Sequence, residues 1–225
     1  TSCTIDVSGY VSSEDGDSLT ITAVFNKNII IDSEFVVTLN STIGNEVITL
    51  IFTSTSSSSN QLVQTYNIGA TDTTNGESLV VSSFTSGSIR DSVDNTMTNT
   101  TVPTGSNMFG GATIFIDNTS PIISSVSLSA NNPTITVNFN EAVFGGLDGD
   151  NHGSGNLVVE DFIFSLSSGE ATLTSTTPTS ISGSAGGTSF ILGIGKTGSP
   201  SSSQILTVNP SSNTVIYDAA GNPAS

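Results

Sequence analysis

Apolar and polar residues alternate along this chain in short runs, and the helical period is almost absent. The clearest run is SLTITAVF at residues 18–25, in which every second residue is apolar. Shorter runs rich in β-branched and aromatic residues follow, with Gly, Ser, Asn or Asp between them. Such residues suit a pleated, half-buried surface, and short strands divided by turn residues are typical of a sandwich or barrel. The pattern predicts an all-β fold, with further strands expected at residues 34–39, 47–52, 78–84, 112–117, 123–129, 134–139, 161–166, 189–194, 204–208 and 214–218.

The order of these segments occurs twice. LTITAVFNKNI, DSEFVVTLNS and SIRDSVDNT in the first half correspond to PTITVNFNEAV, VEDFIFSLSS and VIYDAAGNP in the second. Phe25 and Phe35 are 10 residues apart, whereas their counterparts Phe139 and Phe162 are 23 apart, so the second copy carries 13 extra residues. Asp91 likewise matches Asp218. Internal repetition predicts two copies of one structural unit, with the extra residues in a loop.

The boundary between the copies lies in the short polar segment IDNTSP, residues 116–121. Pro121 biases the residue before it towards extended geometry and cannot donate a hydrogen bond to a sheet. We therefore expect two domains, residues 1–117 and 118–225, joined by a semi-rigid linker. The second domain carries a long, acidic, Gly-rich loop at residues 140–157.

These motifs resemble the tandem immunoglobulin-like repeats of large bacterial cell-surface adhesins and extracellular repeat proteins. The segments that carry the resemblance are DNTSPIISSV, TVNFNEAV and VIYDAAGNPAS in the second copy, with GDSLTITAVFNKNI and SIRDSVDNT in the first. The resemblance implies two antiparallel immunoglobulin-like β-sandwiches in an extended extracellular rod, often with calcium at the joints. The core Trp and paired cysteines of antibody domains are absent, since the chain has no Trp and one Cys.

The charge balance excludes several classes of partner. With three Lys+Arg against 19 Asp+Glu, the formal net charge is -16. Nucleic acids and anionic membranes both need cationic side chains, so we expect neither nucleic-acid binding nor membrane insertion. Cys3 is the only cysteine, which excludes a disulfide within the chain and a cysteine zinc cluster. Acidic side chains instead favour solubility in salt, or sites for hard cations.

The 13 extra residues contain DGDNHG at residues 148–153, which begins like an EF-hand calcium loop. Its fifth position is His152, however, and its twelfth is Val159, where a bidentate Glu is needed. An EF-hand is therefore excluded.

A site at the joint between the domains fits the resemblance better. In an immunoglobulin-like sandwich, the loops after the second and sixth strands lie at the end that faces the preceding domain. Hard cations take six to eight oxygen ligands, several of them carboxylates. We therefore predict a calcium site whose ligands come from these loops and the linker: Asp117, Asn118, Glu141, Asp148, Asp150, Asp218 and Asn222. The alternatives are a local site inside the insertion and a solvated polar end without an ion. The first copy has Lys27 where the second has Glu141, which argues against an equivalent site there.

Enzymatic chemistry has little support. His152 is the only histidine and lies among glycines, and no nucleophile elbow occurs. Glu160 and Asp161 adjoin a strand start, where alternation sends them to opposite faces. We expect no enzyme.

The alternative function is a carbohydrate-binding module, with Tyr10, Tyr66 and Phe144 as the aromatic candidates for stacking on a sugar ring. The triplets NST, NTT and NTS make Asn40, Asn99 and Asn118 glycosylation candidates.

The second copy is expected to lack its own last strand. The first copy continues into MFGGATIFID, whereas the second ends at AGNPAS. Two hypotheses follow: the chain is a piece of a longer repeat protein, or a neighbouring subunit donates the strand, as in donor-strand pilins. Residues 1–10 are the best donor within the chain, although they also align with the first strand of a sandwich.

The sequence as a whole favours a non-catalytic structural or adhesive segment of an extracellular cell-surface protein or filament. Its expected partners are neighbouring repeats or identical subunits, and a glycan or surface receptor.

Overall fold

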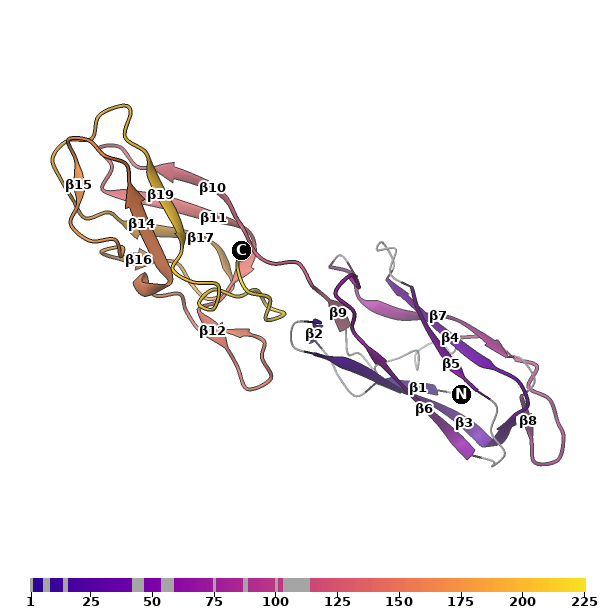
Figure 1. Ribbon diagram of the computed structural model, residues 1–225. Coiled ribbons are helices and arrows are strands. Elements are labelled where there is room, and N and C mark those ends of the chain that lie inside the picture. The colour runs from indigo at the N-terminus through magenta and orange to yellow at the C-terminus, as the bar shows by residue number, and fades with distance from the viewer. Residues whose placement is uncertain are drawn as a thin grey trace. The chain divides into compact units, whose positions relative to one another are not determined.

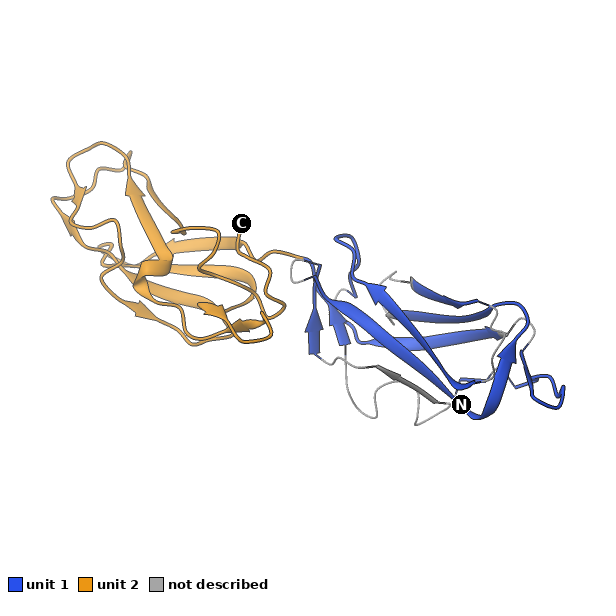
Figure 2. Ribbon diagram, turned by 60° about the horizontal axis from the view of Figure 1, so that its bottom comes forward, with its two compact units in different colours: residues 1–118 blue, residues 119–225 orange. Residues whose placement is uncertain are grey.

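The computed structural model describes residues 2–5, 9–13, 16–41, 47–53, 59–74, 76–86, 89–99, 101–102 and 114–225. These residues form several sheets, mostly antiparallel, and the predicted all-β, sandwich-like fold is confirmed (Figure 1). The chain divides into two compact units, Thr1–Asn118 (unit 1) and Thr119–Ser225 (unit 2), shown in Figure 2. The boundary expected from the sequence, between residues 117 and 118, lies one residue earlier. No helix among the described residues is long and apolar enough to cross a bilayer.

Unit 1 contains two main antiparallel sheets. One has the order β1-β3-β6, with β8 paired to β3, and the other has the order β5-β4-β7, while β2 and β9 form a short parallel pair. The bounds are β1 (Ser2–Ile5), β2 (Gly9–Val11), β3 (Ser18–Ile31), β4 (Phe35–Ser41), β5 (Val47–Phe52), β6 (Ser59–Asn67), β7 (Leu79–Ser86), β8 (Ile89–Asp91) and β9 (Ile114–Ile116).

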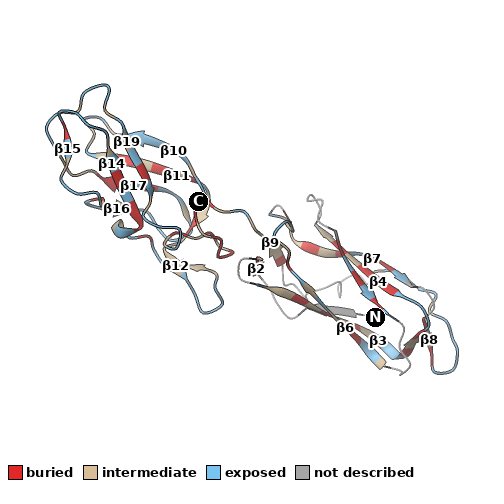
Figure 3. Ribbon diagram, in the orientation of Figure 1, coloured by how far each residue is buried: buried red, intermediate tan, exposed pale blue. Residues whose placement is uncertain are grey.

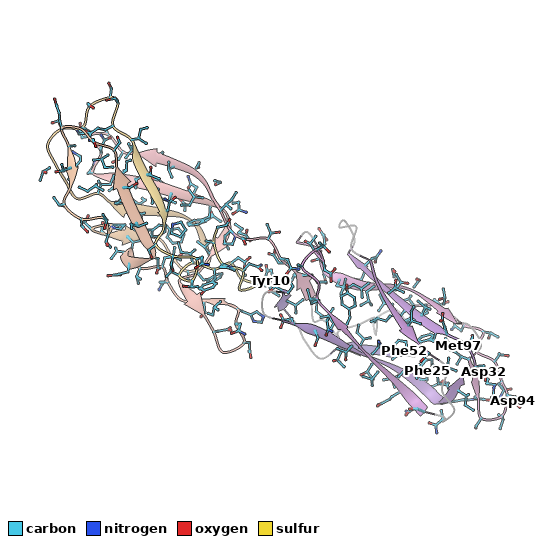
Figure 4. The ribbon with its side chains drawn as sticks, in the orientation of Figure 1. Tyr10, Phe25, Asp32, Phe52, Asp94 and Met97 are labelled. Carbon is cyan, nitrogen blue, oxygen red and sulfur yellow. The ribbon has the colours of Figure 1, made fainter. Side chains whose placement is uncertain are left out.

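The core of unit 1 follows directly from the alternation in SLTITAVF. The apolar positions of this run are buried in β3, and the residues between them are partly exposed. Phe35, the first residue of β4, is fully buried and meets Phe25 edge-on at 5.5 Å between ring centroids. Phe52 lies 5.7 Å from the same ring, and Figure 4 labels Phe25 and Phe52 inside the unit. Aromatic rings that interlock in this way supply much of the apolar area of a small core.

Unit 2 has the sheet β10-β11-β17-β16, the pair β14-β19, the short hairpin β12-β13 and the short antiparallel pair β15-β18. The bounds are β10 (Ile123–Leu128), β11 (Thr134–Val143), β12 (Gly146–Leu147), β13 (Gly153–Ser154), a 3-10 helix η2 (Val159–Asp161), β14 (Phe162–Leu166), β15 (Thr172–Leu173), β16 (Ile181–Ser182), β17 (Gly187–Gly193), β18 (Lys196–Thr197) and β19 (Leu206–Pro210).

The two units repeat the same strand pairings. In unit 1, β1 pairs with β3 and β4 pairs with β7; in unit 2, β10 pairs with β11 and β14 pairs with β19. The Phe25–Phe35 contact recurs as Phe139–Phe162, with ring centroids 6.4 Å apart. The phenylalanines matched by sequence therefore occupy matching places in the two cores.

One predicted strand is wrong. Residues 214–218 form no strand, and only isolated bridges join Tyr217 to Phe144 and to Pro223. Ile216 is nonetheless fully buried, so the apolar pattern correctly marked a core position. The segment turns at Asp218 before a ladder can form, because the Asp218 side chain accepts hydrogen bonds from the backbone N–H groups of Ala220 and Asn222.

Candidate metal centre

Three loops close around an aspartate in the same way. In each, the Oδ1 atom accepts hydrogen bonds from the backbone N–H groups two and four residues later. These bonds measure 3.0 and 2.9 Å at Asp91, 2.9 and 3.0 Å at Asp148, and 2.8 and 2.9 Å at Asp218. The aspartate N–H in turn donates to the carbonyl four residues later. A short acidic side chain thus replaces the backbone partners that a strand would supply, which ends the strand and forms a tight loop.

At Asp91 and Asp218 the loop is closed a second time by an asparagine. The Nδ2 atoms of Asn95 and Asn222 donate to the Oδ2 atoms of these aspartates at 2.9 and 2.8 Å. Hydrogen bonds from Asn95, joined by those from Lys27 and Val93, hold the pKa of Asp91 well below its usual range. The N–H groups of His152 and Asp150 also lower the pKa of Asp148.

The two Asp–Asn loops differ in the charge that faces them. In unit 1, Lys27 Nζ lies 3.1 Å from Asp91 Oδ2, and this ion pair links β3 to the loop. The matching position in unit 2 is Glu141, and a carboxylate oxygen of Glu141 lies within 4.8 Å of one on Asp218. Two like charges at such a distance repel by about 1–4 kcal/mol, depending on how much water screens them. Unit 2 therefore has an acid where unit 1 has its own cation.

Burial makes this difference more costly. Asp218 is fully buried, and Glu141 is partly buried. Because water solvates neither carboxylate completely, a bound cation that faces both would stabilise unit 2. Carboxylate oxygens from two separate segments are the ligands that a hard cation such as calcium prefers, so the residues present fit calcium.

The insertion supports the loop at Asp218 by packing. Gly153, in β13, lies so close to the Asp218 carbonyl that a Cβ atom would overlap it. Its N–H points to the Ala219 carbonyl at 3.4 Å. Asp148 and Asp150, by contrast, lie on the exposed turn of the β12-β13 hairpin, and within the described part of unit 2 they do not join the pair made by Glu141 and Asp218. Sequence reasoning missed Gly153, because a glycine among many glycines carries no signal of a close contact.

The Glu141 side chain is held by a neighbouring residue of its own strand, Asn140 of β11. Asn140 Nδ2 donates to Glu141 Oε1 at 3.0 Å, and Asn140 Oδ1 accepts from the Ile122 N–H at 2.7 Å. The Asn140 N–H donates to the Ile122 carbonyl, and the Ser225 N–H donates to the Pro121 carbonyl. The segment that enters unit 2 is therefore attached next to Glu141.

The remaining predicted ligands, Asp117 and Asn118, belong to unit 1. The Asp117 N–H donates to the Val11 carbonyl at 3.0 Å. Asn118 Oδ1 accepts from the N–H and hydroxyl of Ser13 at 2.6 and 2.9 Å. Its Nδ2 donates to the carbonyls of Gly69 and Asp72 at 3.1 and 2.8 Å. Both ends of the Asn118 amide thus join loops of unit 1, which favours a structural role over ligation or glycosylation.

Replacing Asn118 by alanine is expected to lower the free energy of unfolding of unit 1 by about 1–3 kcal/mol, because it leaves partly buried backbone groups of Ser13, Gly69 and Asp72 without this partner. Urea denaturation followed by amide hydrogen exchange measures the change separately in each unit. Asn99→Ala is the matched control, because Asn99 is exposed and accepts one local bond, from Thr101. Equal stabilities of the two variants would contradict the role assigned to Asn118.

The other glycosylation candidates and the sugar-stacking candidates lie in varied settings. Asn40 lies within β4, and Asn99 is exposed. Tyr10 stacks on Phe115 at 5.3 Å and keeps 38% of its surface exposed (Figure 4). Tyr66 donates its hydroxyl hydrogen to Asp72 at 2.7 Å. Phe144, in unit 2, is only partly exposed.

The side chains considered for catalysis differ in how far they are exposed. Glu160 is exposed, whereas Asp161 is 5% exposed and accepts a hydrogen bond from the Val158 N–H. Burial raises the pKa of Asp161. His152 is half-buried, in the loop closed by Asp148.

No protein-family model matches the chain, and no curated protein matches it. The resemblance to tandem immunoglobulin-like repeats stays a prediction. A function must therefore rest on the geometry within each unit.

Proposed function

We propose that the chain is a non-catalytic structural and adhesive segment of an extracellular cell-surface protein or filament, stiffened by calcium where the two units join. Its partners are neighbouring repeats or identical subunits, and a glycan or receptor at the surface. One observation supports the calcium site. The Asp–Asn loops of the two units match, but Lys27 lies beside the loop of unit 1, whereas Glu141 lies beside the loop of unit 2.

The Asp218 carboxylate of unit 2 corresponds to the Asp91 carboxylate of unit 1. In unit 1 the Oδ2 atom of Asp91 accepts from both Asn95 and the Lys27 ammonium. The Asp218 Oδ2 atom receives the same bond from Asn222, and the residue at the position that matches Lys27 is Glu141. A divalent cation between Asp218 and Glu141 would do in unit 2 what Lys27 does in unit 1.

Calcium takes six to eight oxygens, so two carboxylates need help from further side chains, backbone carbonyls or water. The linker residue Asp117 stays the third carboxylate predicted from the sequence.

Calcium is expected to raise the melting temperature of unit 2 in the full chain. Extracellular calcium modules bind with dissociation constants of about 0.1–1 mM, so ion concentrations of about 10 mM add roughly 1–3 kcal/mol and shift the transition by several degrees. Differential scanning calorimetry in EDTA and in calcium chloride measures this shift. Magnesium at the same concentration serves as control, because it releases its own waters reluctantly and is expected to shift the transition less. Identical transitions in EDTA and calcium would overturn the proposed metal site.

A further inference from the structure

Residues 145–155, in the part of unit 2 that holds the extra residues, form a hairpin that is closed at both ends, called here the insertion hairpin. Its strands β12 and β13 are paired. At the tip, Asp148 Oδ1 accepts from the N–H groups of Asp150 and His152 at 2.9 and 3.0 Å. At the base, the N–H of the first residue donates to the carbonyl of the last at 3.2 Å. The tip, residues 147–151, is exposed (Figure 3).

The base of the insertion hairpin is attached to the segment that carries Asp218. Phe144, the residue before the hairpin, donates its N–H to the Tyr217 carbonyl at 2.8 Å and accepts from the Tyr217 N–H at 3.0 Å. Tyr217 directly precedes Asp218, and Phe144 follows Glu141 by three residues. The two segments that carry the Glu141 and Asp218 carboxylates are therefore joined to each other by this backbone bridge.

A second contact joins the returning strand of the hairpin, β13, to the loop at Asp218. The Gly153 N–H points to the Ala219 carbonyl at 3.4 Å. A Cβ atom at Gly153 would overlap the Asp218 carbonyl and would lie 2.7 Å from the Phe144 ring. The hairpin thus packs directly on the backbone of the loop, with no space for a side chain at this position. The backbone that carries the Asp218 carboxylate is therefore supported by the hairpin.

The corresponding part of unit 1 is short and has its own cation. There β3 leads into β4 through residues 32–34, in place of a hairpin. Lys27 of β3 pairs with Asp91 at 3.1 Å, so this ion pair itself fixes the distance between the strand and the loop. In unit 2 the matching partner of the aspartate is Glu141, and two carboxylates repel each other. They must therefore be held in place by other contacts before a cation binds.

The distance between the two carboxylates suits one calcium ion. Calcium binds oxygens at about 2.3–2.6 Å, so two oxygens on the same ion are at most about 5 Å apart. Carboxylate oxygens of Glu141 and Asp218 lie within 4.8 Å of each other. An element that keeps them at this distance before the ion arrives raises the affinity, because binding then has to order less of the chain.

We propose that the insertion hairpin positions the Glu141 and Asp218 carboxylates for calcium. It does so through the backbone bridge between Phe144 and Tyr217 and through the packing of Gly153 on the loop at Asp218. Asp148 closes the tip and acts on the site only through the shape of the hairpin, so it is a positioning residue and not a ligand. This role rests on the proposed calcium site, and it gives the 13 extra residues of unit 2 a purpose that unit 1 does not need.

Replacing Gly153 by alanine is expected to raise the dissociation constant for calcium about 10–100-fold, as loss of outer-shell support does in other metal sites. Isothermal titration of the full chain with calcium chloride measures the constant, and a melting curve in EDTA shows whether the chain is folded at the titration temperature. Gly149→Ala is the matched control, because Gly149 lies in the exposed tip and a Cβ atom there meets nothing within 4 Å. We expect the control to bind calcium within about twofold of the original chain, since exposed substitutions usually change little.

Two substitutions of Asp148 separate the shape of the hairpin from its charge. Asp148→Ala is expected to weaken calcium binding at least about threefold, because the two hydrogen bonds that close the tip are lost. Asp148→Asn is expected to restore the original affinity, because an amide oxygen accepts the same two bonds without the charge. Equal losses in both variants would show that the charge acts on the ion, and would overturn the positioning role of Asp148. The tip is exposed, so this pair remains informative if Gly153→Ala does not fold.

The remaining outcomes separate the hairpin from the calcium site itself. Unchanged calcium affinity in folded Gly153→Ala would overturn the role of the hairpin and leave the calcium site in place. Equal losses in Gly153→Ala and Gly149→Ala would also overturn it, because the contact with the Asp218 loop would then be irrelevant. Absence of calcium binding by the original chain would instead overturn the proposed function, so the two failures are distinguishable.

Discussion

Replacing Phe162 by alanine is expected to lower the free energy of unfolding of unit 2 by about 3–5 kcal/mol. Phe162 is 1% exposed, begins β14 and lies 6.4 Å from the Phe139 ring. Its removal loses apolar burial and leaves a cavity, because the paired strands around it can collapse only in part. Domains of this size are stable by about 5–15 kcal/mol, so one such change removes a large share of the total.

Urea denaturation of the full chain, followed by hydrogen exchange in each unit, measures this loss. Ile163→Ala is the matched control, because Ile163 is the next residue of β14 but points outward, with 43% of its surface exposed. We expect the control to cost less than about 1 kcal/mol. Unit 1 should keep its stability in both variants, since it has its own core. Equal losses for Phe162 and Ile163 would contradict the assignment of the inward face of β14.

Replacing Glu141 by lysine is expected to abolish the response of unit 2 to calcium. The variant places in unit 2 the residue that unit 1 has at Lys27, so its ammonium group can pair with Asp218 as Lys27 pairs with Asp91 at 3.1 Å. The like-charge repulsion disappears at the same time. We therefore expect the Glu141→Lys chain to melt at the same temperature in EDTA and in calcium, and above the original chain in EDTA.

The reciprocal change, Lys27→Glu, is expected to lower the stability of unit 1 in EDTA and to let calcium restore it. Calorimetry of both variants measures the exchange. Glu170→Lys is the control for net charge, because Glu170 is exposed in the turn between β14 and β15. If Glu170→Lys also removes the calcium response, the effect reflects total charge rather than a site. A calcium response that survives Glu141→Lys would exclude Glu141 as a ligand.

Prediction from the sequence was most accurate where a short run of residues decides the local structure. Alternation over residues 18–25 predicted a strand with one buried face, and β3 has that pattern. The match of Phe25 and Phe35 to Phe139 and Phe162 predicted equivalent positions, and both pairs of rings are in contact. Side-chain direction in a strand depends on residue parity alone, so a local pattern is sufficient.

Prediction was weaker where distant segments meet. Residues 214–218 have the composition of a strand, but the Asp218 carboxylate binds the N–H groups of Ala220 and Asn222 and closes a loop. Asp148 is acidic and close in sequence to Glu141, yet its carboxylate closes its own exposed turn. Composition cannot distinguish a carboxylate that caps a turn from one that faces a neighbour, because both uses need the same residue.

Residues 139–162, the part of the second copy that holds the insertion, show most clearly what the sequence and the tertiary structure each determine. The sequence by itself determined that these residues hold 13 more than their counterpart, that they leave strand geometry and that they form no EF-hand. Only the tertiary structure decided that Gly153 packs on the Asp218 carbonyl and that Glu141, rather than the acids of the insertion, lies beside Asp218. It also decided that Val126 and Leu128 face the core and yet stay half-exposed. The physical reason is that alternation and turn residues act within a few positions, whereas contacts between loops depend on how the sheets bring distant residues together.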